Sequence, residues 1–140
     1  MFNTKRRLLS LTLIAAMFFV MAIPASARAS EYIKSLSIIT TPSGNGKISI
    51  TVDVTSTDIM QEVGLVKIIV NEKSASGSYK PVYTFTKDQY NMLAKQRSSY
   101  AITVTYQGTP GKDYYITAQC YAKNTSGSGT SWAGSKTVHV

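Results

Sequence analysis

Apolar and polar residues alternate along most of this 140-residue chain after residue 30. The period of two is clearest at 47–55, 99–106 and 113–123, and it predicts strands of an antiparallel sheet with one buried and one solvated face. The first of these strands would bury Ile48, Ile50, Val52 and Val54. The second would bury Tyr100, Ile102, Val104 and Tyr106, and the third would bury Tyr114, Ile116, Ala118, Cys120 and Ala122.

Four weaker segments, at 32–40, 64–71, 79–86 and 131–140, complete an expected set of seven strands. Pro81 places the segment that contains it at a sheet edge, because proline has no N–H to donate to a strand ladder. The segment at 64–71 is apolar on both sides, as expected for a central strand.

Two short helical turns are also expected between the strands. Asp58 with Gln61, and Thr86 with Gln89, have the spacing of helix-capping pairs. Gly64 would end the first of these turns.

The first 27 residues have the pattern of an export signal. Residues 5–7 are basic, residues 8–23 are uncharged and mostly apolar, and residues 25–27 (Ala-Ser-Ala) are as small as a signal peptidase requires. We therefore expect cleavage after residue 27 to release a secreted domain spanning 28–140. That domain contains no second apolar run long enough to span a membrane.

Seven short strands with regular turn signals in one small domain indicate an immunoglobulin-like sandwich. The end of the chain resembles a fibronectin type III domain in Pro110-Gly111, in Tyr114 and in the run Ala122–Gly129 (AKNTSGSG). These match that family's Pro-Gly turn, its strand-F tyrosine and its Ala-x-Asn-x-x-Gly-x-Gly motif. The resemblance implies an all-β, seven-stranded immunoglobulin/fibronectin-III-like antiparallel sandwich. The chain also resembles small exported domains of unknown function from Gram-positive bacteria, for which no activity is implied.

The residue types needed for catalysis are scarce. His139 is the only histidine and Cys120 the only cysteine, and strand alternation puts them on opposite faces, so they do not form a base and nucleophile pair. We expect Cys120 to be a small buried hydrophobe, although a disulfide between two molecules stays open. A calcium site at Asp53, Asp58 and Glu62 also stays open. The sequence thus predicts a protein that is not an enzyme and has no cofactor.

The charge pattern also limits the class of partner. Removal of residues 1–27 would lower the formal net charge from +8 to +5, and the remaining lysines are dispersed singly. Dispersed charge gives weak attraction to anionic polymers, but it is not the clustered footprint of a nucleic-acid-binding protein.

Tyrosine is the residue type that points to binding, because nine tyrosines exceed what a core of this size needs. Tyrosine offers a large contact area with few rotatable bonds. A simpler interpretation is that the exposed tyrosines only shield the sheet and favour strand formation. The side chains expected to share an outward face are Tyr115, Gln119, Tyr121, Lys67, Ile69 and Tyr83.

These observations predict a secreted, non-catalytic interaction module that binds an extracellular protein or wall component. A carbohydrate-binding module is the alternative. Tyr115 and Tyr121 would lie about 20 Å apart along one strand. Stacking on adjacent sugar rings would therefore need Tyr83 or Trp132 between them.

Overall fold

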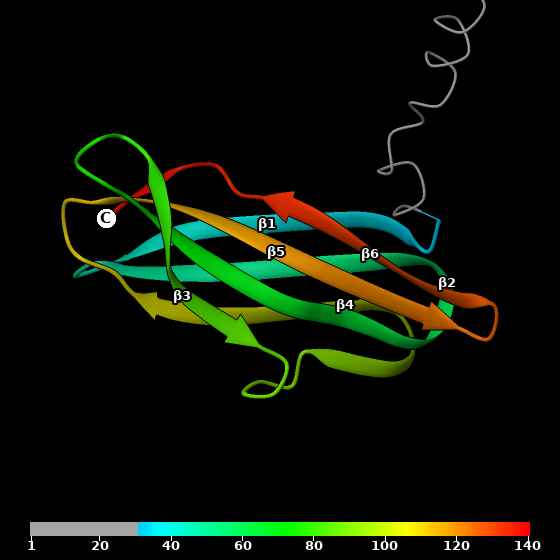
Figure 1. The fold of residues 1–140 in the computed structure, drawn as a ribbon. Helices are drawn as coiled ribbons and strands as arrows, with labels where there is room; N and C mark the ends of the chain where they lie inside the picture. The colour runs from blue at the N-terminus through cyan, green and yellow to red at the C-terminus, as the bar shows by residue number, and fades with distance from the viewer. Residues whose placement is uncertain (1–30) are drawn as a thin grey trace, which may run out of the picture.

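The computed structural model describes residues 31–140, and the expected export signal at 1–27 lies outside this range. The described part of the chain consists of strands and turns and contains no helix. All strand pairings are antiparallel, and the seven strands form one sheet that curves into an open half-barrel (Figure 1). The strands are β1 (Ile33–Gly44), β2 (Lys47–Lys73), β3 (Tyr79–Thr86), β4 (Leu93–Gln107), β5 (Asp113–Asn124), β6 (Gly127–Gly134) and β7 (Val138–His139).

The longest strand, β2, changes partners along its length. Its first part, Lys47–Thr55, lies between β1 and β4. Its last part, Lys67–Glu72, lies between β5 and β3. In the middle, residues 60–65 pair with the start of β4 and with the end of β5. One continuous strand therefore connects the two parts of the curved sheet, as Figure 1 shows.

The predicted alternation is confirmed in the three clearest strands. All four apolar residues predicted inward in the first part of β2 are fully buried, as are all five in β5. In β4, Val104 is buried, while Tyr100, Ile102 and Tyr106 are half-buried and pack against the same core. Both parts of β2 contribute to this single core, with Val52 from the first part and Ile68 from the second.

The expectation of a helical turn at Asp58–Gln61 is wrong, because this segment continues β2. Four residues of β2 lie between Thr55 and Met60, whereas only one residue of β4 separates their partners, so β2 bulges here. The buried Ser56 hydroxyl lies 2.6 Å from the carbonyl oxygen of Asp58 and 2.9 Å from that of Ser98. Pairing with β4 resumes at Met60 and pairing with β5 begins at Glu62, so β2 continues through this segment.

The second expected helix, after Thr86, is a single turn. The N–H groups of Gln89 and Tyr90 both donate to the carbonyl oxygen of Thr86 at 3.1 Å. The chain is already extended at Leu93, where β4 begins. The capping pattern therefore predicted the position of this turn correctly, but the turn does not extend into a helix.

The expected last strand, 131–140, is divided into β6 and β7. The break falls at Ser135, whose hydroxyl accepts a hydrogen bond from the N–H of Ile116 at 2.9 Å. β3 lies at a sheet edge, as Pro81 predicted, because β2 is its only partner strand within the described residues.

Candidate binding face

The outward side chains of the second part of β2, of β5 and of β6 form one surface, called here the outer face. On β5 these side chains alternate with the fully buried ones. Strand register places Lys67 opposite Gln119, and Gln119 opposite Trp132, so three strands contribute to one row. The outer face comprises Lys67, Ile69, Asn71, Tyr115, Thr117, Gln119, Tyr121, Thr130 and Trp132.

Five of the six side chains predicted to share a face do so in the structure. Besides the row at Lys67 and Gln119, Ile69 lies opposite Thr117, and Tyr115 and Tyr121 lie further along β5. All five are half-buried, because neighbouring side chains cover part of each.

The sixth predicted side chain, Tyr83, lies elsewhere, and its assignment to this face is wrong. Tyr83 is opposite the buried Val70, and its ring packs 4.7 Å from that of Phe85 and 5.8 Å from that of Tyr106. The register between β2 and β3 shifts beyond Val70, so Val82 is an extra residue in β3. One extra residue moves every side chain beyond it to the other side of the sheet.

Trp132 is the most exposed aromatic side chain of the outer face, with 51% of its surface accessible. Lys67 Nζ lies 5.4 Å from the centre of the tryptophan ring, within the range of a cation–π contact. The only tryptophan lies in a segment of alternating residues, which is a signal in the sequence for its outward position. Its neighbour Lys67 is about 65 residues away, and only strand pairing brings the two side chains together.

Tyr115 is held in place at one end of the outer face. Its ring centre is 5.9 Å from that of Tyr79, and the Asn71 side chain donates to its carbonyl oxygen at 3.0 Å. Its hydroxyl lies so close to Gly134 that a side chain at that position would collide with it. Sequence reasoning did not identify the contact with Tyr79, which depends on the pairing of β3 with β2.

Tyr121 lies at the other end, beside a hollow. Its partner on β2 is Gly64, which has no side chain to cover it. The hollow has a volume of about 310 Å³ and is lined by Tyr121, Glu62, Leu65, Val66, Lys87 and Leu93. The outer face therefore offers an exposed tryptophan flanked along the sheet by tyrosines at both ends.

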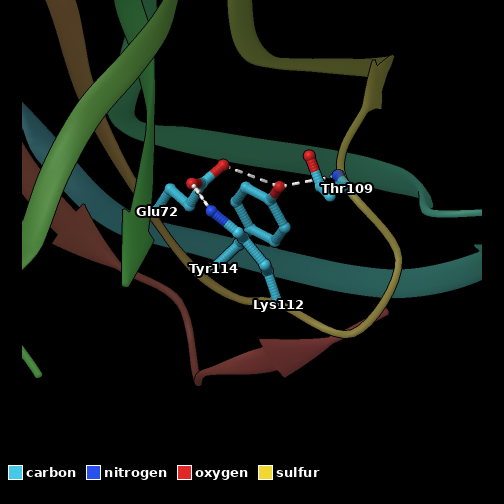
Figure 2. Close-up of polar contacts among 4 residues, drawn as sticks. All are labelled: Glu72, Thr109, Lys112 and Tyr114. Atoms are coloured by element: carbon cyan, nitrogen blue, oxygen red, sulfur yellow. Dashed lines mark hydrogen bonds and ion pairs between the residues drawn. The ribbon is translucent and has the colours of Figure 1, made fainter. Parts of the chain in front are cut away.

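At the turn before β5, the buried Tyr114 joins a polar cluster at the protein surface, which Figure 2 shows in detail. Its hydroxyl accepts a hydrogen bond from the N–H of Thr109 at 2.7 Å and donates one to Glu72 Oε2 at 2.9 Å. Lys112 Nζ donates to Glu72 Oε1 at 2.7 Å. Hydrogen bonds from Lys112 and then from Tyr114 lower the pKa of Glu72. This cluster joins β2, β5 and the turn that precedes β5.

The two side chains considered for catalysis, Cys120 and His139, do not come together in the described structure. Cys120 is fully buried, and this burial raises the pKa of its thiol to about 11. His139 is exposed, and its Nδ1 lies 2.6 Å from Asp113 Oδ1. The two residues therefore face opposite sides, as predicted from the alternation.

The calcium site considered at Asp53, Asp58 and Glu62 is not assembled. Between residues 31 and 140, no three His, Cys, Asp or Glu side chains gather closely enough to hold a metal ion. Asp58 Oδ1 instead accepts a hydrogen bond from the neighbouring N–H of Ile59 at 2.7 Å.

Comparison with known proteins identifies no relative by sequence. No family model matches the chain, and no curated protein matches it. One similar solved structure is described as a target of the Northeast Structural Genomics Consortium, with 15% identity over 79% of this chain and 87% of that chain, and a TM-score of 0.40. Within residues 31–140 there is no helix that is long and apolar enough to cross a membrane.

Proposed function

We propose that this protein is an exported, non-catalytic interaction module that binds an extracellular protein or wall component through the outer face. The observation that carries the proposal is Trp132, which is half exposed at the β6 end of a sheet row that continues through Gln119 to Lys67. A large exposed aromatic side chain surrounded by hydrogen-bonding groups is typical of residues that dominate binding energy. The basic and apolar pattern of residues 5–23 supports export.

We further propose that the domain is an immunoglobulin-like sandwich of the fibronectin type III kind. The pairing order supports this: β1 and β4 flank the first part of β2, while β3 and β5 flank the last part. β6 pairs with β5 and extends the second group, so the two groups contain three and four strands when β2 is counted in both, as expected for the two layers of such a sandwich. The hydroxyl of Tyr114, bonded to the backbone of Thr109 five residues earlier, supports the role of corner tyrosine.

The proposal that the protein is not an enzyme rests on the chemistry of its available groups. A buried thiol with a raised pKa is a poor nucleophile. His139 and Asp113 form an exposed pair on the surface. For His139 to act as a general base, a nucleophile must lie within hydrogen-bonding reach of its ring.

Carbohydrate binding is the second candidate, and the position of Trp132 favours it. Trp132 is opposite Gln119, and Gln119 lies between Tyr115 and Tyr121 on β5. The tryptophan ring therefore fills part of the gap that would otherwise separate the two tyrosines too widely for adjacent sugars. Flat aromatic rings at such spacings stack on sugar faces, and Gln119 supplies a polar group for hydroxyls.

The test compares Trp132→Ala and Tyr121→Ala with the parent protein in pull-downs from culture medium and on a glycan array. Both variants should lose the ligand that the parent captures, because truncating an aromatic anchor of an interface costs about 2 kcal/mol or more of binding energy. Both should melt within a few degrees of the parent, since outward cross-strand contacts contribute only about 0.2–1 kcal/mol.

The matched control is Ile39→Ala, which truncates an exposed side chain on β1, away from the outer face. It should bind as the parent does. Equal binding by the parent and Trp132→Ala would contradict the proposed face. Capture of defined glycans rather than proteins would select the carbohydrate-binding alternative.

A further inference from the structure

The free edges of the curved sheet differ in how they are protected against pairing with another strand. A strand edge presents unpaired N–H and C=O groups, and proteins block such edges with proline, lysine, short strands or bulges. β3 has Pro81, Lys80 and an extra residue at Val82. β1 has Lys34 and Pro42, with register shifts near both of its ends.

The remaining edges are short, with one exception. β6 has eight residues, of which Gly127, Gly129 and Gly134 are glycines, and β7 has two residues. The exception is β4, a 15-residue strand whose partner is β2 alone within the described residues. Figure 1 shows β4 along one margin of the molecule.

The segment Ser98–Gln107 of β4 has none of these protective features. Its sequence, SSYAITVTYQ, contains no proline, no glycine and no charged residue. Its register with β2 is uninterrupted from Ser99 to Gln107, so this edge has no bulge along nine consecutive residue pairs. It is rich in β-branched and aromatic residues, which favour strand pairing.

The surface beside this edge is also nearly uncharged. The outward side chains of β4 are small, namely Ser99, Ala101, Thr103 and Thr105, and all are exposed. Next to them on β2 lie Ser49, Thr51, Asp53 and Thr55, of which Asp53 alone is charged. Thr51 and Thr103 hydroxyls are 2.9 Å apart and satisfy each other. A neighbouring strand would therefore meet little charge and few long side chains on this surface.

The distribution of charge along β4 favours one arrangement for a second strand. Lys95 and Arg97 lie at the start of β4, whereas Gln107 at its end is neutral. Parallel pairing of two copies would bring these cations together. Antiparallel pairing about a two-fold axis near Ile102 would place Arg97 of each copy beside the neutral end of the other.

The apolar side of β4 gives a further reason for pairing. Tyr100, Ile102 and Tyr106 pack against the core but stay partly exposed. A two-fold axis near Ile102 would place the same three side chains of a second copy next to them. Their remaining apolar surface would then be covered on both copies at once.

We propose that two copies of this chain pair antiparallel through Ser98–Gln107 of β4, joining their sheets into one continuous sheet across a two-fold axis. The interface is isologous, because the same strand contributes to both sides. It lies away from the outer face of β2, β5 and β6, so the dimer would present two outer faces and would bind a repetitive ligand with avidity.

The test is the mass of the purified parent chain in solution over a concentration series, by sedimentation or light scattering, beside Ala101→Lys. The parent should rise to the mass of a pair. Ala101→Lys should stay at the mass of one chain, since lysine on an edge strand blocks pairing and the two-fold axis would bring two lysines together. Ala101 lies opposite Asp53, so the new lysine has an acceptor within its own chain and the fold should be retained.

The control is Ile39→Lys, which places the same charge on the same side of the sheet at the protected edge strand β1. It should form the pair as the parent does. Amide exchange of β4 in the parent should slow as concentration rises. A parent that stays monomeric throughout the series would overturn the proposal, as would pairing that survives Ala101→Lys or is lost equally in Ile39→Lys.

Discussion

At the scale of single residues, Tyr114 shows how one side chain connects distant parts of the chain. Its ring is fully buried and packs edge-on against Tyr106 at 5.7 Å, while its hydroxyl bonds both Thr109 and Glu72. The ring therefore contributes apolar burial, and the hydroxyl satisfies one backbone donor and one carboxylate. Sequence reasoning identified Tyr114 as inward, but Glu72 was not part of that prediction, because only the pairing of β2 with β5 places it opposite.

Replacing Tyr114 by Phe should lower the free energy of unfolding by about 0.5–1.5 kcal/mol, the usual net contribution of a hydrogen bond, because Thr109 and Glu72 are open to solvent and water replaces the lost hydroxyl. Chemical denaturation at neutral pH measures this loss. The matched control is Tyr121→Phe, which removes a hydroxyl from the outer face and should change stability by less than about 0.5 kcal/mol. Equal effects of the two variants would contradict a stabilising role for the Tyr114 hydroxyl.

The same cluster sets a pH dependence whose direction follows from Glu72. Because the hydrogen bonds from Lys112 and Tyr114 lower the pKa of Glu72, its carboxylate contributes stability above its ordinary pKa. That contribution is lost as the pH falls through the lowered value. The acid side of the stability profile should therefore be shallower in Tyr114→Phe than in the parent.

At the scale of elements, the continuity of β2 depends on the close approach of β4 at Gly64. The N–H of Leu65 donates to the carbonyl oxygen of Met92 at 2.7 Å. A methyl group at Gly64 would collide with that carbonyl oxygen and would lie 2.9 Å from the Cα of Leu93. Gly64 therefore allows the backbone of β4 to approach β2 closely, whereas its sequence context suggested that it ends a helix.

Gly64→Ala should destabilise the protein by about 1–3 kcal/mol, the usual cost of forcing extra volume into a packed site. Thermal unfolding with the parent and Gly134→Ala in parallel measures this effect. At Gly134 the atoms nearest to an added methyl group are the phenol end of the Tyr115 side chain, whereas at Gly64 they are backbone atoms, so the cost at Gly134 should be smaller. The reverse order of stability would show that β4 does not cross at Gly64 as described.

At the scale of the whole molecule, one core stabilises the curved sheet. Buried residues from β1, β2, β3, β4, β5 and β7 belong to a single cluster, to which the turn before β4 adds Met92. Cys120 lies fully inside this cluster, with its thiol 3.5 Å from the carbonyl oxygen of Ser131. Access to this sulfur therefore requires the core to open.

Modification of Cys120 by a thiol reagent should be slow in the folded protein and should follow global unfolding. Burial removes the sulfur from solvent, and a thiol pKa of about 11 leaves little thiolate at neutral pH. The reaction rate, measured over a denaturant series, should rise in parallel with the unfolded fraction. Rapid modification without denaturant would show that β5 does not bury this face.

How much of the fold follows from sequence depends on the range of the interaction that decides each feature. Strand alternation is a local property, because successive side chains point to opposite sides. Ile48, Val52, Ile116 and Cys120 were therefore assigned correctly to the core. The outward positions of Tyr115 and Tyr121 on β5 followed from the same alternation.

Only the tertiary structure decided the features that depend on pairing between distant segments. Asp58 and Gln61 satisfy a local capping pattern, but pairing with β4 from Met60 and with β5 from Glu62 makes the segment part of a strand. An extra residue at Val82 turned Tyr83 toward the core side, and strand register brought Lys67 to Trp132. Register and bulges are set by the partner strand, and a single chain segment carries no information about which partner it will meet.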